Sequence, residues 1–164
     1  MDRLEQIRVK ADQMIEQLAQ EGERKFAYIH LYGVSQFAAL LAMIHHIDAE
    51  LCQIAAMLHD IAVYAYNVAQ KDHAQKSAEL AQAILEESAI FTKKEIQTIT
   101  HAIAVHSDKQ VREDNVYAEV LKDADVLAHY LYNPNIPMSE HDQVRLYYLM
   151  EALSKYPLNQ QGKA

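Results

Sequence analysis

The sequence predicts an all-α protein, and three observations lead to that prediction. The chain of 164 residues contains only three Gly and three Pro, which leaves few positions for the tight turns that a β-sandwich or a β-barrel needs. The segments between them are rich in Ala, Leu, Ile, Gln, Glu and Lys, most of which favour helices. Apolar residues also recur at spacings of three and four. A chain of this length suits one domain, so we expect a compact bundle of about six to seven helices across residues 1–164.

Three helices are expected in the N-terminal part of the chain. Residues 4–19 have an amphipathic pattern, and Gly22 is expected to close this helix. The second helix spans about residues 27–46. Asp48 suits the N-cap of a third helix, which continues to Ile61. Residues 64–70 are polar and aromatic, and we expect them to form a connection.

Four further helices are expected in the rest of the chain. Asp72, with Gln75 three residues later, resembles a capping box that opens a fourth helix through residue 85. The fifth and sixth helices span residues 93–106 and 117–132, with a charged loop between them. A segment with two prolines ends the sixth helix. Ser139 and Asp142 then cap a last helix that reaches about residue 155.

The composition excludes several classes of partner. A net charge of −8 and a pI near 5.5 argue against nucleic acid or an acidic membrane as the main partner. The single cysteine, Cys52, cannot form an internal disulfide and suits a reducing compartment. The N-terminus is charged and lacks the apolar core of a signal peptide, and no apolar run approaches the length of a membrane span. We therefore expect a cytoplasmic protein with a solvated acidic surface.

Polar residues interrupt the apolar stripes of three expected helices. His30 continues one stripe, His59 and Asp60 directly follow an apolar run, and Asp125 shares a face with Leu121. A buried imidazole or carboxylate costs several kcal/mol unless it is paired or binds a metal ion. Together, imidazole and carboxylate donors suit Mn, Fe, Co, Ni or Zn better than Ca. The sequence therefore predicts a site for a divalent transition metal. The alternative is a His30 that binds a carbonyl in the core and an Asp60 that pairs with a nearby Lys or Arg.

Other metal and nucleotide motifs are missing from the sequence. No His follows a Glu at the spacing of the di-iron carboxylate bundles. The chain has no His-Glu-x-x-His helix, no P-loop and no dinucleotide-binding glycine pattern. One cysteine also excludes a thiolate zinc site.

The order of these motifs resembles the HD superfamily of metal-dependent phosphohydrolases. An early helical His, the segment AAMLHDIA and the segment LKDADVL carry the resemblance, which covers residues 26–132. The N-terminal helix 4–19 and the C-terminal helix 139–155 flank this core. The resemblance implies a metal site whose four ligands are His30, His59, Asp60 and Asp125.

Two further histidines match the superfamily members that hold two metal ions. His73 lies in KDHAQKSAELAQAIL and His106 in AIAVHSDK. The resemblance implies that they bind a second ion and that Asp60 bridges the pair, so one or two ions are expected. The periodicity also directs His106 inward, whereas His101 lies about 140° away around the helix. We assign no role to the remaining histidines, which are His45, His46, His129 and His141.

The resemblance implies hydrolysis of a phosphate ester or nucleotide by a metal-activated water. The partner would be a small phosphorylated, nucleotide-like substrate, and a homo-oligomer is left open. Asp60 would position the water, and Lys109 is the first candidate for a phosphate clamp, ahead of Arg24 and Lys71. The alternatives are a non-catalytic sensor that binds metal or nucleotide, and an HD-type di-iron oxygenase. The chain lacks the Gly-Tyr-Pro signature of the cyclic-di-GMP phosphodiesterases.

The two aspartates of LKDADVL are expected to have different roles. Asp123 and Asp125 lie two residues apart on a helix, so their side chains diverge by about 200°. Both faces are apolar, and the periodicity does not choose between them. The resemblance selects Asp125 as the ligand, which leaves Asp123 as a structural residue.

Overall fold

A computed structural model of the chain describes residues 2–66 and 70–156. The described residues contain eight α-helices and one short 3-10 helix, and no strand, which confirms the predicted all-α fold. In chain order the elements are α1 (Arg3–Ile15), α2 (Glu21–His45), α3 (Ala49–Leu58), α4 (Ile61–Tyr66), η1 (Gln70–Asp72), α5 (His73–Ser88), α6 (Lys93–Val105), α7 (Val116–Tyr132) and α8 (Glu140–Ser154).

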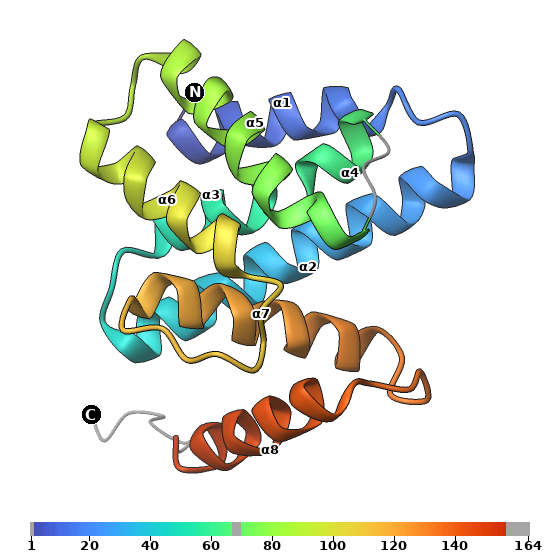
Figure 1. The fold of residues 1–164 in the computed structure, drawn as a ribbon, viewed down its shortest axis with the longest axis vertical. Coiled ribbons are helices and arrows are strands. Elements are labelled where there is room, and N and C mark those ends of the chain that lie inside the picture. Colours follow the sequence, from blue (N-terminus) through green and yellow to red (C-terminus); the bar gives the residue numbers. More distant parts are fainter. Residues whose placement is uncertain (1, 67–69, 157–164) are drawn as a thin grey trace, which may run out of the picture.

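The long helix α2 runs through the middle of the fold and packs against α3 and α7 (Figure 1). Helices α5 and α6 pair with each other, and α6 also contacts α3 and α7. Helix α8 lies at one edge of the molecule, where it packs on α7. The apolar faces of these helices meet in one core, which includes Leu31, Ile54, Met57, Ile103 and Leu121.

Helix α1 is fixed to the core by both apolar and charged contacts. Ile7 and Ile15 are buried on its inner face. At its start, the Arg3 guanidinium forms ion pairs with Glu50 on α3 and Glu95 on α6. The N-terminal helix therefore links two elements that are distant in the sequence.

The boundary between the first two helices differs from the prediction. Helix α1 ends at Ile15 and α2 begins at Glu21, so Gly22 lies in the first turn of α2 and does not close α1. Glu21 and Glu23 in this turn favour a helix N-terminus. The N–H groups in the first turn of a helix have no hydrogen-bond partner within the helix. A glycine in this turn therefore costs the helix little stability.

The predicted third helix is interrupted at the two central candidate residues. Helix α3 ends at Leu58, His59 and Asp60 form a turn, and α4 begins at Ile61. Helix α4 takes up the start of the segment predicted as a connection, and residues 67–69 of that segment lie outside the described residues. This break places the His59 and Asp60 side chains at the end of α3. Their directions are therefore not fixed by the residue spacing of one continuous helix.

The structure also tests the predicted caps. The side chains of Asp48 and Ser139 accept hydrogen bonds from the first turns of α3 and α8, which confirms both caps. The Asp72 side chain makes no capping hydrogen bond, so that prediction was wrong, and η1 leads into α5 instead. A capping box that the sequence reading missed joins Thr92 and Glu95 at the start of α6.

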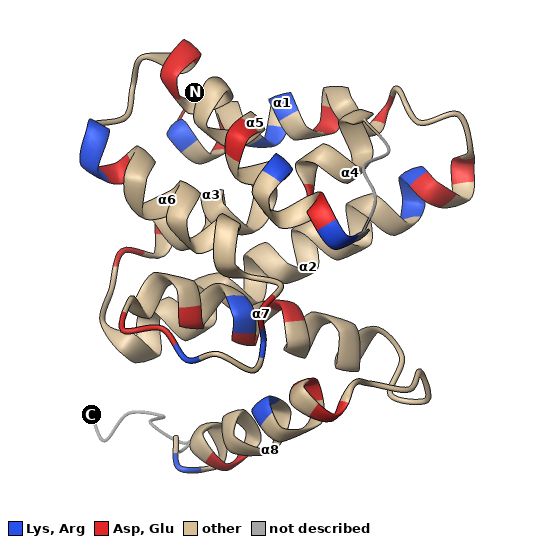
Figure 2. Ribbon diagram, viewed as in Figure 1, with Lys and Arg blue, Asp and Glu red and all other residues tan. Residues whose placement is uncertain are grey.

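Helix α2 is long and apolar enough to cross a membrane by length and composition alone. The core helix of a soluble protein passes the same test, and α2 contributes Leu31, Val34 and Leu41 to the core. Figure 2 shows Lys and Arg interspersed with Asp and Glu along the helices and loops.

Candidate metal centre

Six side chains predicted as metal ligands converge at the centre of the fold. They come from α2 (His30), the turn between α3 and α4 (His59 and Asp60), the first residue of α5 (His73), the end of α6 (His106) and α7 (Asp125). All are buried except Asp60, whose side chain is 20% exposed. Five separate parts of the chain therefore supply polar groups to one buried point.

Four of these residues form what we call the first cluster: His30, His59, Asp60 and Asp125. The Nε2 atoms of His30 and His59 lie 3.1 Å apart. Asp60 Oδ2 lies 3.4 Å from each of them. Asp125 Oδ1 lies 3.6 Å from His30 Nε2 and 3.8 Å from His59 Nε2. The four donor atoms thus face one common point.

The second cluster consists of His73, His106 and the same Asp60. The Nε2 atoms of the two histidines are 3.1 Å apart. Asp60 Oδ1 lies 3.4 Å from each. Asp60 therefore directs one carboxylate oxygen to each cluster.

The donor geometry fits bound metal ions. Donor atoms about 2.1 Å from one ion lie roughly 3.0–3.5 Å apart at octahedral or tetrahedral angles, and most distances in the clusters fall near this range. Asp60 Oδ1 and Asp125 Oδ1 are buried and have no hydrogen-bond partner within the described residues. Buried carboxylate oxygens without a donor are costly. A cation in the first cluster would satisfy Asp125 Oδ1, and a cation in the second would satisfy Asp60 Oδ1.

Backbone carbonyls set the tautomer of two of the histidines. His59 Nδ1 lies 2.7 Å from the Ala56 carbonyl, and His106 Nδ1 lies 2.7 Å from the Ile103 carbonyl. A carbonyl only accepts hydrogen bonds, so each Nδ1 carries the proton. The lone pair of each Nε2 is thereby directed into the clusters, as in metal-binding histidines.

The protonation states of His59, Asp60 and Asp125 favour metal binding. At His30, burial lowers the pKa, but Asp60 and Asp125 outweigh this effect and raise it above its usual value, so a metal ion would have to displace a proton there. Burial lowers the pKa of His59 to about 4, which keeps its imidazole neutral at pH 7. Burial opposes ionisation of Asp60, but the neighbouring imidazoles hold the pKa of this carboxyl well below its usual range. Burial likewise opposes ionisation of Asp125, and Lys109 with the histidines lowers its pKa. Neutral imidazoles and ionised carboxylates are the forms that bind metal.

Lys109, the predicted phosphate clamp, is placed at the centre but is already paired. Its Nζ lies 2.6 Å from Asp125 Oδ2 and donates to the His106 carbonyl at 2.7 Å. Lys109 therefore holds the second oxygen of a candidate ligand. Of the weaker clamp candidates, Arg24 donates to the Leu18 carbonyl, and Lys71 is exposed on η1.

Asp123 lies on a different side of α7 from Asp125 and binds a residue of α8. Its Oδ1 is 2.8 Å from Arg145 Nη1, which also contacts Glu119 Oε2 at 2.9 Å. The same guanidinium donates from Nε and Nη2 to the Lys109 carbonyl. Arg145 thus ties α7 to the loop that positions Lys109 and, through Lys109, Asp125.

His129, to which the sequence reading gave no role, also lies at the centre. Its ring stacks on His30 with centroids 4.9 Å apart, and its Nδ1 is 3.7 Å from Asp125 Oδ1. The side chain is 54% exposed. The spacing of four residues from Asp125 on one helix is the sequence signal that identifies it.

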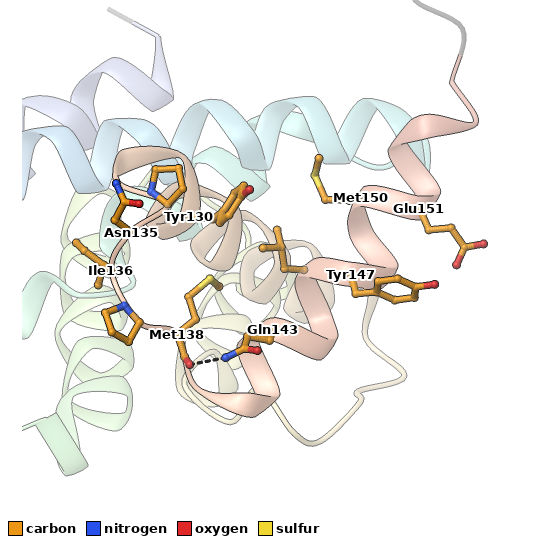
Figure 3. Close-up of a pocket in the computed structure, with 11 residues that line it drawn as sticks. Tyr130, Asn135, Ile136, Met138, Gln143, Tyr147, Met150 and Glu151 are labelled. Carbon is orange, nitrogen blue, oxygen red and sulfur yellow. Dashed lines mark hydrogen bonds between the residues drawn. The ribbon is translucent and has the colours of Figure 1, made fainter.

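A cavity of about 810 Å³ leads from the surface to the clusters. His30 and Asp60 lie in its wall, together with His129 and residues from the α1–α2 connection, α2 and α4. A separate cavity of about 690 Å³ lies between the 133–138 loop and α8 (Figure 3). Its lining includes none of the six candidate ligands. The 810 Å³ cavity therefore gives access to the candidate metal centre.

Comparisons with known proteins identify the family and the fold of the chain. Residues 27–130 match the HD domain family. The crystal structure of a predicted HD superfamily hydrolase from an uncultured Thermotogales bacterium is similar over 94% of this chain and 96% of that chain. The TM-score is 0.59 and the sequence identity is 19%, so this likeness shows the fold alone. No curated protein sequence matches the chain significantly.

Proposed function

Because the chain belongs to the HD domain family, we propose that it is a metal-dependent phosphohydrolase that acts on a phosphate ester of a small molecule. The observation that carries the proposal is the pair of clusters joined by Asp60 at the inner end of a cavity. Two sets of donors that share one carboxylate are suited to a dinuclear site. The buried imidazoles favour Mn, Fe, Co, Ni or Zn.

Different residues of the chain would have different roles in such a reaction. Bound ions would lower the pKa of a coordinated water and polarise a phosphoryl oxygen. Asp60, which is 20% exposed and lines the cavity, is in a position to orient the attacking water. Lys109 holds Asp125 in place through its 2.6 Å ion pair. The His59 and His106 rings are fixed by their carbonyl partners and need no reorganisation before metal binds.

Metal content and hydrolysis, measured on the same preparations, test this proposal. We expect the wild type to hydrolyse a phosphoester from a broad panel only when loaded with a divalent transition metal. His59→Ala and Asp60→Ala should lose most of the metal and the activity. His101→Ala is the matched control, because His101 is 46% exposed and lies outside both clusters. Metal content should also fall as the pH drops through the imidazole range.

Three outcomes would contradict the proposal. Full metal occupancy in both ligand variants would exclude the site. Full occupancy of the wild type without turnover of any phosphoester would favour a non-catalytic sensor. Oxygen uptake coupled to an organic substrate would favour the oxygenase alternative.

A further inference from the structure

The walls of the 810 Å³ cavity indicate which class of phosphoester the centre accepts, an inference that rests on the proposed function. Among the cluster residues, His30 and Asp60 line this cavity. A phosphoryl group that reaches the centre through the cavity must therefore lie against these two side chains. The rest of the substrate then faces the remaining walls. A cavity of this size is typical of sites that enclose a whole small molecule.

Aromatic and amide side chains form much of the remaining wall. Phe26 lies parallel to the His30 ring, with centroids 5.8 Å apart and an interplanar angle of 4°, and it is 44% exposed. Tyr64 and the amide side chains of Gln17 and Gln20 also line the cavity. Flat rings favour stacking with a planar group, and amides hydrogen-bond to neutral polar groups.

The charge of the wall is unfavourable for a second phosphate. Glu23 is an acidic residue of the lining, and the lining residues that the structure describes include no Lys or Arg. Lys109 is paired with the Asp125 carboxylate, and Arg24, which donates to the Leu18 carbonyl, is not a lining residue. A further phosphate outside the clusters would therefore meet a like charge, with no cation among the described lining residues to balance it.

We propose that the substrate is an ester with a single phosphate and an uncharged leaving group that carries a planar ring, and that Glu23 discriminates against polyphosphates. Hydrolysis of such an ester consumes one water. The water oxygen forms the new bond to phosphorus, the ester P–O bond breaks, and a proton from the water ends on the released alcohol.

Adenosine 5′-mono-, di- and triphosphate form a suitable probe series, because they differ only in phosphate number. We would measure binding by calorimetry and hydrolysis as kcat/KM on metal-loaded protein, with metal in excess over nucleotide. The monophosphate should be preferred by about tenfold, as expected when like charges are juxtaposed. Equal or better binding of the di- or triphosphate would overturn the inference, and so would binding of none of the three.

Two variants isolate the charge of the wall. Glu23→Lys should reduce the preference for the monophosphate at least threefold. Glu21→Lys is the matched control: Glu21 lies in the same exposed first turn of α2 but not in the cavity lining, so the preference should not change. Equal effects of both variants would contradict a specific role of Glu23. A binding preference without hydrolysis would support the inference on substrate class and contradict the proposed catalytic function.

Discussion

Separate replacement of Asp123 and Asp125 by Ala tests which face of α7 serves the metal centre. Asp125→Ala removes a donor from the first cluster and leaves Lys109 with the His106 carbonyl as its hydrogen-bond partner among the described residues. We expect this variant to be metal-poor and inactive. Asp123→Ala removes only a partner of Arg145. We expect it to keep its metal, with affinity or activity lowered about 10–100-fold, as for residues that support ligands indirectly.

The structure also sets the expected loss of stability for Asp123→Ala. Complete removal of the partners of a buried charge costs about 3–5 kcal/mol. Arg145 keeps Glu119 and the Lys109 carbonyl, so we expect a loss of about 1.5–3 kcal/mol, the value of one charged hydrogen bond. For a chain of this size, that corresponds to a decrease in Tm of roughly 3–12 °C.

The assay combines metal analysis with thermal unfolding, with and without a chelator. Asp114→Ala is the control, because Asp114 is an exposed aspartate of the neighbouring loop, and both its metal content and its Tm should stay at wild-type values. If Asp123→Ala proved metal-poor while Asp125→Ala kept its metal, the wrong aspartate and the wrong face of α7 would have been assigned.

Three further predictions follow from other parts of the structure. His73→Ala and His106→Ala should each reduce the metal content from about two ions to one per chain, and unchanged content would contradict the second cluster. The Arg3 hydrogen bond lowers the pKa of the Glu95 carboxyl from 4.5 to about 2. The ionised carboxylate therefore stabilises the folded state above pH 4.5, and this stabilisation is lost as the pH falls toward 2. Arg3→Ala should therefore weaken the acid dependence of unfolding between these values, and an identical pH profile would refute the coupling. Burial raises the pKa of the Cys52 thiol to about 12, so a thiol reagent should modify Cys52 only after unfolding, and rapid modification of the native protein would contradict its burial.

The sequence predicted the helices best where an apolar stripe continues without interruption. The stripe over residues 93–106 became α6 (Lys93–Val105), and that over 117–132 became α7 (Val116–Tyr132). The failures lie at helix ends. Gly22 and the break at His59 and Asp60 depend on local backbone geometry, which periodicity does not encode.

The candidate ligands were predictable because each is a polar residue within or beside an apolar stripe, and the resemblance to a family selected among them. Their supporting contacts were not predictable. Lys109 and Asp125 are 16 residues apart, and Arg145 and Asp123 are 22 residues apart. No spacing rule within one helix connects such pairs, which meet only when the loop after α6 and helix α8 fold onto α7.

Anomalous diffraction from crystals of metal-replete protein tests the two-cluster arrangement most directly. We expect two anomalous peaks, one within the first cluster and one within the second, with Asp60 contacting both ions. Peaks elsewhere in the molecule, or a second cluster whose histidines turn toward solvent under metal-replete conditions, would contradict this arrangement.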